Sequence, residues 1–155
     1  MEEMPVVQED LRRIVFRGLN DPFDVLTPWP LNDDSVEFID IGTCVAHLPH
    51  GDPRLQHEDG FVFFMREAWR VLIPGGLLTV TAPLATNSFS VADPRACRFF
   101  NEGSFVHFAR PTQIEPEDWR WDRYGTDNGT RFLQVNLAHD AIGVVAALEK
   151  PDAAR

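Results

Sequence analysis

The side chains with the greatest capacity for chemistry lie in a polar stretch that contains three of the five histidines. His47, His50 and His57 are followed at once by Glu58 and Asp59. Imidazole and carboxylate groups are ligands for zinc and similar metals. The spacing of these side chains matches no common zinc pattern, however, and no second layer of hydrogen-bonding partners is visible. The stretch is therefore predicted to be a polar loop with solvated histidines that holds no metal.

Carboxylates form a second group of ionisable side chains, around the sequence Pro28-Trp29-Pro30. The members of this group are Asp24, Asp33, Asp34, Glu37 and Asp40. Paired carboxylates can act as general acid and general base. The Asp, Asn and Pro content of the segment is also that of a turn-forming loop, and a solvated loop is the preferred interpretation.

No serine or cysteine lies in a nucleophile signature. The serines lack the G-x-S-x-G context, and Cys97 has no nearby histidine in a known arrangement. Cys44 and Cys97 lie in apolar surroundings, which is typical of free thiols in a reducing compartment, with a disulfide between them as the alternative. The first residues are acidic and contain no apolar signal core. We therefore expect a cytoplasmic protein.

The charge of the chain argues against two classes of partner. Lysine and arginine number 14 against 24 aspartates and glutamates, which gives a formal net charge of −10. Such a surface repels phosphate backbones and anionic membranes. No apolar stretch is long enough to span a bilayer. We expect neither a nucleic acid nor a membrane as partner.

The elements that must position these side chains centre on Phe64–Pro83. Its first half places apolar residues on one face at helical spacing and charged residues on the other. Pro74 cannot continue a helix, and Gly75-Gly76 can take the positive φ of a helix end. Leu77–Ala82 is then an apolar, β-branched run that predicts a buried strand.

Further strands are predicted on both sides of this unit. Val36–Val45 precedes the helix, whose N-terminal cap is predicted at Glu58 or Asp59. Arg131–Leu137 and Ala141–Leu148 follow it. A helix that leads through a tight turn into a hydrophobic strand is half of a βαβ unit. The fold class is therefore α/β, with a mostly parallel sheet and antiparallel C-terminal strands.

Three shorter elements complete the expected secondary structure. They are a strand at Phe23–Leu26, a helix at Glu102–Ala109 capped by Asn101, and a strand at Asp118–Tyr124. The length of 155 residues suits one domain with one core. We predict a single domain over 1–150 and a disordered tail over 151–155.

Four pieces of sequence, taken in order, resemble a known family. They are Pro28-Trp29-Pro30-Leu31 with the following Asp34-Ser35-Val36, then Cys44–Pro49, then Phe64–Gly76, then Asp93-Pro94 before Arg98-Phe99-Phe100. Their order and spacing are similar to those of class I S-adenosylmethionine-dependent methyltransferases, and more narrowly of the methyltransferase type 11-like proteins. The resemblance runs from about Asp24 to Arg110, which is over half of the chain.

This resemblance implies a shortened Rossmann-like methyltransferase sheet with S-adenosylmethionine at the carboxyl ends of its parallel strands. In such enzymes the sulfonium methyl is already activated, and the protein aligns the acceptor with it. The family pattern places Asp24 and Val25 beside the adenine. It places Gly42, Thr43 and His47 along the cofactor and acceptor. His47 is then a candidate general base, with a structural histidine as the alternative.

The sequence departs from the family where the cofactor is normally bound. The Gly-rich D/E-x-G-x-G turn is absent, and Gly18 is the only glycine before Asp24. Family polar residues are replaced by Thr43, Ala46 and Ala96. The chain thus resembles a truncated form in which cofactor binding is degenerate or absent, and it is expected to be inactive rather than active. A non-catalytic, homodimeric binding or regulatory module on the same scaffold is the alternative function.

The missing first strand of the family has a structural consequence. Without it, the strand predicted at Val36–Val45 has a bare edge inside a hydrophobic slab, and such edges are normally covered. Either Ile14–Arg17 takes this place, or a second protomer or another protein partner does.

Overall fold

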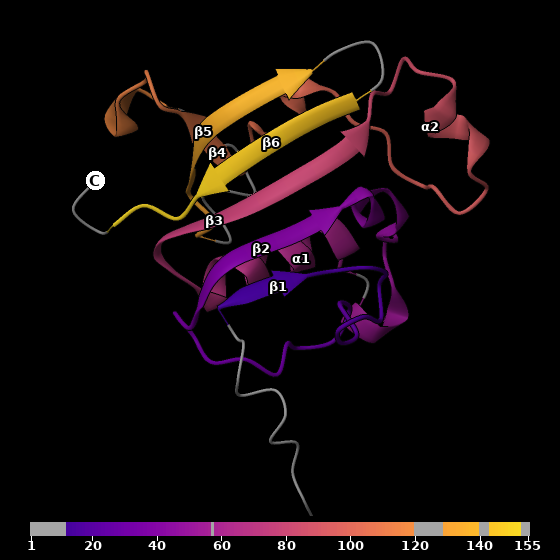
Figure 1. Ribbon diagram of the computed structural model, residues 1–155, viewed down its shortest axis with the longest axis horizontal. Helices are drawn as coiled ribbons and strands as arrows, with labels where there is room; N and C mark the ends of the chain where they lie inside the picture. The colour runs from indigo at the N-terminus through magenta and orange to yellow at the C-terminus, as the bar shows by residue number, and fades with distance from the viewer. Residues whose placement is uncertain (1–11, 57, 120–128, 140–142, 153–155) are drawn as a thin grey trace, which may run out of the picture.

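The computed structural model describes residues 12–56, 58–119, 129–139 and 143–152, and it contains a six-stranded sheet in the order β1-β2-β3-β6-β5-β4 (Figure 1). The strands are Arg13–Val15 (β1), Val36–Gly42 (β2), Leu72–Pro83 (β3), Ala109–Pro111 (β4), Phe132–His139 (β5) and Gly143–Glu149 (β6). The helices are Gly60–Val71 (α1) and Phe89–Ala92 (α2). Short 3-10 helices occupy Thr43–His47, Pro53–Leu55, Glu102–Phe105 and Pro116–Asp118.

The strand directions confirm the predicted fold class. β1, β2 and β3 are parallel neighbours, whereas β3, β6 and β5 pair antiparallel. β4 is parallel to β5. The chain therefore folds as a shortened Rossmann-like α/β sheet with antiparallel C-terminal strands. None of the helices in the described part of the chain has the length and apolarity needed to cross a membrane.

Helix α1 begins where a carboxylate satisfies its free N–H groups. Asp59 Oδ1 accepts from the backbone N–H groups of Phe61 at 2.8 Å and Val62 at 3.1 Å, which confirms the predicted cap. Phe64, Met65 and other apolar residues of the helix are buried. This apolar face packs on the side of the sheet that lies behind β1 and β2 in Figure 1.

Strand β3 begins five residues earlier than predicted, at Leu72. Leu72 pairs with Val36, so the chain enters the sheet as soon as the helix ends. The backbone then passes through Pro74 and Gly75, whose φ of 90° suits glycine. Gly75 donates to the carbonyl of Lys150 at 2.6 Å, and Lys150 donates to Gly76 at 3.0 Å. Hydrogen bonds with neighbouring strands on both sides of Pro74-Gly75 thus make β3 continuous through residues that the sequence predicted to be a turn.

The edge of β2 is covered from within the chain. β1 pairs with β2 in parallel, with Ile14 opposite Ile39, and the N–H of Phe16 donates to Asp40 at 2.8 Å. This confirms the first of the two alternatives, that the segment near Ile14 takes the vacant place. A second protomer is therefore not needed at this edge.

Two predicted elements in the first half of the chain differ in the structure. β2 ends at Gly42, and the residues after it form a 3-10 helix instead of continuing to Val45. Phe23–Leu26 is not a strand, because the Asp24 carboxylate accepts from Leu26 N–H at 2.9 Å and holds a turn.

The predicted helix after Asn101 is also shorter. Asn101 forms the expected cap, but only Glu102–Phe105 is helical, as a 3-10 turn, and Ala109 already begins β4. The strand predicted at Asp118–Tyr124 does not begin at Asp118, because this residue ends a 3-10 turn. Its residues 120–124 lie outside the described residues.

Candidate functional site

The carboxyl ends of β1, β2 and β3 point to the same edge of the sheet, where open α/β sheets bind ligands. Gly42 ends β2 with a φ of 57°, a conformation that favours glycine, and its N–H donates to the Asp40 carboxylate at 3.0 Å. The chain then turns into the Thr43–His47 helix. Thr43 is exposed at its start, and His47 is half-buried at its end.

His47 is joined to a carboxylate from a distant part of the chain. Its Nε2 lies 2.8 Å from Oδ2 of Asp93, which follows α2. The backbone N–H of Arg95 donates to the other Asp93 oxygen at 3.0 Å. This N–H and then His47 lower the pKa of Asp93 to about 2. A carboxylate that orients an imidazole is an arrangement suited to general acid–base chemistry.

The pKa of Asp93 gives a testable pH dependence. Because this value lies below the usual value of about 3.9, the pair stabilises the fold above about pH 4 and loses this contribution as the pH falls through about 2. We expect the side-chain ¹³C resonance of Asp93 to titrate with a midpoint of about 2. In the variant His47→Ala the midpoint rises, whereas in His50→Ala it stays. A midpoint near the usual aspartate value in the unaltered protein would show that the pair does not form.

His50 serves the structure of the loop before α1. One ring nitrogen lies 3.1 Å from Asp59 Oδ2 and the other lies 3.0 Å from the carbonyl of Cys97. Arg98 donates to Leu48 at 2.7 Å and to Asp59 at 2.7 Å, so the same carboxylate caps α1 and anchors a second loop. Burial raises the pKa of Asp59, but Arg98 and the helix N–H groups outweigh it and lower the pKa overall.

The histidine-rich stretch does not assemble a metal site among the described residues. His47 and His50 each bind a different carboxylate, and no three metal-binding side chains converge in the part of the chain that the structure describes. His57 lies outside the described residues.

The two residues predicted to lie beside an adenine have other partners. Asp24 accepts from Leu26 N–H and from Arg54 Nη1 at 3.3 Å, and Arg54 in turn binds Asp52. Val25 is fully buried, and its carbonyl accepts from Trp29 Nε1 at 3.0 Å. Within the described residues, no hydrogen bond or ion pair joins Asp24 or Val25 to Gly42, Thr43 or His47.

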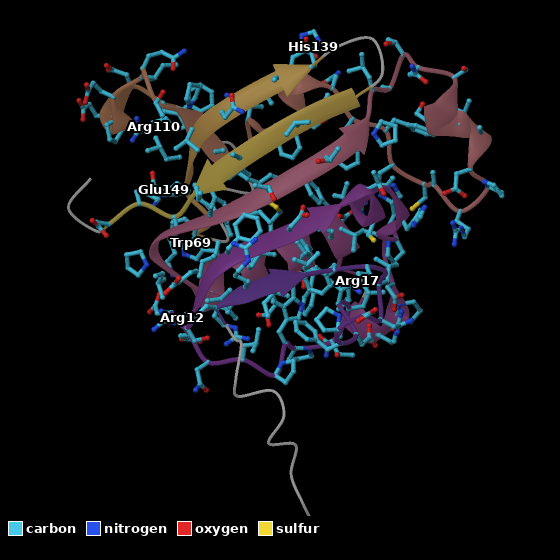
Figure 2. The ribbon with its side chains drawn as sticks, in the orientation of Figure 1. Arg12, Arg17, Trp69, Arg110, His139 and Glu149 are labelled. Atoms are coloured by element: carbon cyan, nitrogen blue, oxygen red, sulfur yellow. The ribbon has the colours of Figure 1, made fainter. Side chains whose placement is uncertain are left out.

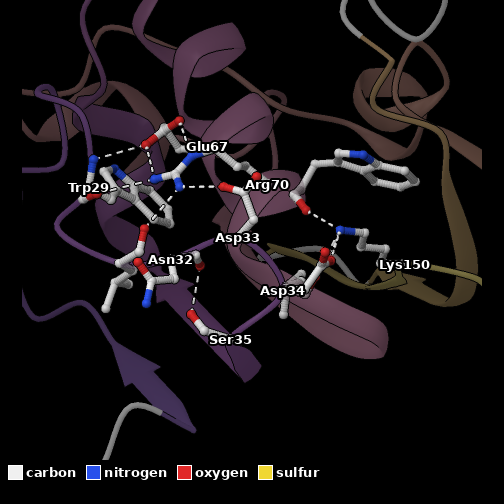
Figure 3. Close-up of polar contacts among 11 residues, drawn as sticks. Trp29, Asn32, Asp33, Asp34, Ser35, Glu67, Arg70 and Lys150 are labelled. Carbon is white, nitrogen blue, oxygen red and sulfur yellow. Dashed lines mark hydrogen bonds and ion pairs between the residues drawn. The ribbon is translucent and has the colours of Figure 1, made fainter. Parts of the chain in front are cut away.

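Two carboxylates of the acidic group, Asp33 and Asp34, are bound by cations. Figure 3 shows Arg70 of α1 between Glu67 and Asp33, with its Nη1 2.8 Å from Asp33 Oδ1. Lys150 binds Asp34 at 2.7 Å. These ion pairs fix the loop on α1 and on the end of β6, so a structural role is assigned to the cluster.

Aromatic side chains pack together at the carboxyl end of β1. Phe16, the residue after β1, is buried with its ring centroid 5.3 Å from Phe23, 5.4 Å from Trp29 and 6.0 Å from Phe64. The Phe16 carbonyl accepts a long contact from Cys44 Sγ at 3.9 Å, and burial raises the pKa of that thiol. The ring of Phe16 therefore packs on the loop around Trp29 and on α1, and its carbonyl contacts the thiol of Cys44, two residues after β2 ends.

A glycine-lined approach for S-adenosylmethionine does not fit these residues. Arg17 N–H donates to Asp21 at 3.1 Å, which closes a tight turn directly after Phe16. The sequence did not predict this cluster, although Phe16, Phe23 and Trp29 are three aromatic residues within a short stretch before the predicted strand Val36–Val45.

No family model matches the chain, and no curated protein matches it. Among solved structures, the chain is similar to the cyclase SpnF, with TM-score 0.47, 13% identity, and coverage of 83% of this chain and 54% of that one. It is also similar to an S-adenosylmethionine-dependent methyltransferase from Aquifex aeolicus, with TM-score 0.41, 15% identity, and coverage of 81% and 51%.

A third similar structure is an S-adenosylmethionine-dependent methyltransferase from Thermotoga maritima, named as a possible histamine N-methyltransferase. Its TM-score is 0.42 and its identity is 19%, and the match covers 79% of this chain and 59% of that one. The chain thus spans roughly half of the length of these three proteins. Their names denote different reactions, and one fold hosts many functions. At these TM-scores and identities the likeness says nothing about the activity of this chain.

Proposed function

We propose that this chain is a methyltransferase-fold protein that has no working S-adenosylmethionine site and acts as a non-catalytic binding module. The observation that carries this proposal is the aromatic cluster at the carboxyl end of β1. Phe16 packs there on Phe23 and Trp29, at the edge of the sheet where a cofactor would need open backbone. A polar cofactor placed against these rings would lose hydrogen bonds to water without gaining partners.

Other residues support the same proposal. Val25 is fully buried, so its side chain contributes to the core. The N–H of Gly42 is already bound to Asp40, and the Asp24 carboxylate is already bound to Arg54. The Gly42 N–H, the Asp24 carboxylate and the His47 ring, which the family pattern assigns to the cofactor or the acceptor, therefore each have a partner within the protein.

A small methyltransferase with a reduced cofactor site is the second candidate function. The His47–Asp93 pair favours it, because an imidazole held by a carboxylate can remove a proton from a methyl acceptor. His47 is half-buried, so solvent reaches the pair.

Ligand-dependent stability separates the two candidates. A ligand that binds only the folded state at 100 times its dissociation constant adds about 2.7 kcal/mol, which raises the melting temperature of a domain of this size by about 5–11 °C. We expect S-adenosylmethionine and S-adenosylhomocysteine at about 1 mM to leave the melting temperature within about 1 °C. An active methyltransferase serves as positive control. A saturable rise that is smaller in both Asp24→Ala and His47→Ala would contradict the proposed function and support the second candidate.

The binding partner is proposed to be a protein in the cytoplasm. The net charge of −10 disfavours nucleic acid and anionic membranes. Cys44 and Cys97 are free thiols, which suits a reducing compartment.

A further inference from the structure

The segment between β3 and β4 begins with a loop whose two ends are joined. Leu84 and Phe100 form an isolated parallel bridge, and the N–H of Ala85 donates to the carbonyl of Phe100 at 2.6 Å. We call residues 85–99 the α2 loop, since they carry the short helix α2. Figure 1 and Figure 2 both show this loop projecting beyond the carboxyl end of β3. A surface loop that is closed at its base can move as one unit about that base.

Val91 and Phe99, two large apolar side chains of the α2 loop, lie outside the core. Their exposed fractions are 66% and 52%. Ser90 is buried, but its hydroxyl donates to the carbonyl of Asn87 at 2.7 Å, which lies in the same loop. A segment that adds little apolar burial to the core opens at a free energy well below that of global unfolding.

A polar contact fastens the outer part of the α2 loop to the end of the sheet. Asp93 Oδ2 lies 2.8 Å from Nε2 of His47, the last residue of the 3-10 helix that follows β2. The Asp93 side chain is 35% exposed and the His47 side chain is 24% exposed. A pair in such partly solvated surroundings shifts an equilibrium by only about fivefold or less.

A stronger set of contacts fixes the last residues of the α2 loop. Arg98 donates to Asp59 at 2.7 Å and to two backbone carbonyls of the loop before α1, and its side chain is only 10% exposed. The N–H of Cys97 donates to the carbonyl of Ala46 at 2.9 Å. Breaking a buried charge pair costs far more than breaking a partly solvated one. The loop is therefore expected to release at Asp93 while Arg98 stays in place.

We propose that residues 85–96 are a lid that opens and closes over His47 at the carboxyl end of β2, with the His47–Asp93 pair as its latch. In the closed form, the Asp93 carboxylate occupies the Nε2 side of the imidazole. In the open form, that nitrogen faces solvent at the edge of the sheet where open α/β folds bind ligands. The latch thus controls whether a partner or a ligand reaches His47.

Amide ¹⁵N relaxation dispersion of the full chain tests the lid, because it detects minor states that interconvert on the microsecond to millisecond timescale of loop motions. We expect the amides of Val91, Arg95 and Ala96 to report one shared exchange process, with an open form populated at about 1%. The amides of Phe64 and Met65 report no exchange, since both residues are fully buried in α1.

Removal of the latch shifts this equilibrium. His47→Ala is expected to raise the open population about fivefold, because only the closed form contains the pair. Once Asp93→Ala is in place, His47→Ala adds no further increase, since both substitutions remove the same contact. The matched control is Arg95→Ala, which truncates an exposed side chain of the same loop and leaves the open population within about twofold.

Three outcomes overturn the lid. They are the absence of dispersion from the α2 loop in both the unaltered protein and His47→Ala, an open population that His47→Ala leaves unchanged, and dispersion that extends equally to α1. The lid is independent of the proposed function. A lid in a chain that binds S-adenosylmethionine would contradict the proposed function alone, whereas a fixed loop in a chain that does not bind it would overturn the lid alone.

Discussion

Phe64→Ala is expected to lower the free energy of unfolding by about 4 kcal/mol, the largest effect of any single substitution considered for this chain. Phe64 is fully buried on α1, and its ring centroid lies 5.4 Å from Trp29 and 6.0 Å from Phe16. Truncation removes apolar surface and leaves a cavity where α1, the loop around Trp29 and the end of β1 meet. Urea unfolding monitored by circular dichroism measures this change.

The matched control for this substitution is Phe99→Ala. Phe99 is 52% exposed, so its truncation is expected to change stability by less than about 1 kcal/mol. If Phe64→Ala and Phe99→Ala had similar effects, α1 would not pack on the aromatic cluster as described.

Arg70→Ala is expected to lower the free energy of unfolding by about 3 kcal/mol. Arg70 donates to both oxygens of Glu67, which is buried, and to the carbonyls of Trp29 and Leu31 (Figure 3). Its hydrogen bond with Glu67 raises the pKa of the guanidinium, so it stays charged in every condition used. Removal leaves a buried carboxylate without its cation and frees the loop that carries Asp33.

Arg66→Ala is the control in the same helix. Arg66 pairs with Glu58, but its side chain is more exposed than that of Arg70, and its loss is expected to cost less than about 1 kcal/mol. The same urea titration compares the two variants. An Arg70→Ala effect no larger than that of Arg66→Ala would show that the charge network does not hold the loop.

The strands and the main helix could be predicted because their signals are local. α1 follows from helical spacing and from the Asp59 cap, and β2, β5 and β6 follow from apolar runs. The boundaries were less accurate where pairing overrides local preference. β3 begins at Leu72 because Val36 and Lys150 supply hydrogen-bonding partners for the residues around the Pro-Gly-Gly turn.

Only part of the candidate site could be predicted from the sequence. His47 could be selected from its type and from the family pattern, but its partner Asp93 is 46 residues away and no local signal links the two. The filling of the end of β1 depends on how Phe16, Phe23 and Trp29 meet in three dimensions. The absence of a Gly-rich turn predicts degenerate or absent cofactor binding, and this stays a prediction that the proposed function takes up.

The central claim is that the carboxyl ends of β1 and β2 are closed by packed side chains and do not receive S-adenosylmethionine. Amide ¹H–¹⁵N spectra recorded during titration with this ligand test the claim residue by residue. We expect the resonances of Phe16–Asp21 and of Gly42–His47 to stay in place up to about 1 mM ligand, a concentration at which even weak sites are filled appreciably. Saturable shifts confined to these two segments would contradict the claim and show that the end of the sheet opens to hold the cofactor.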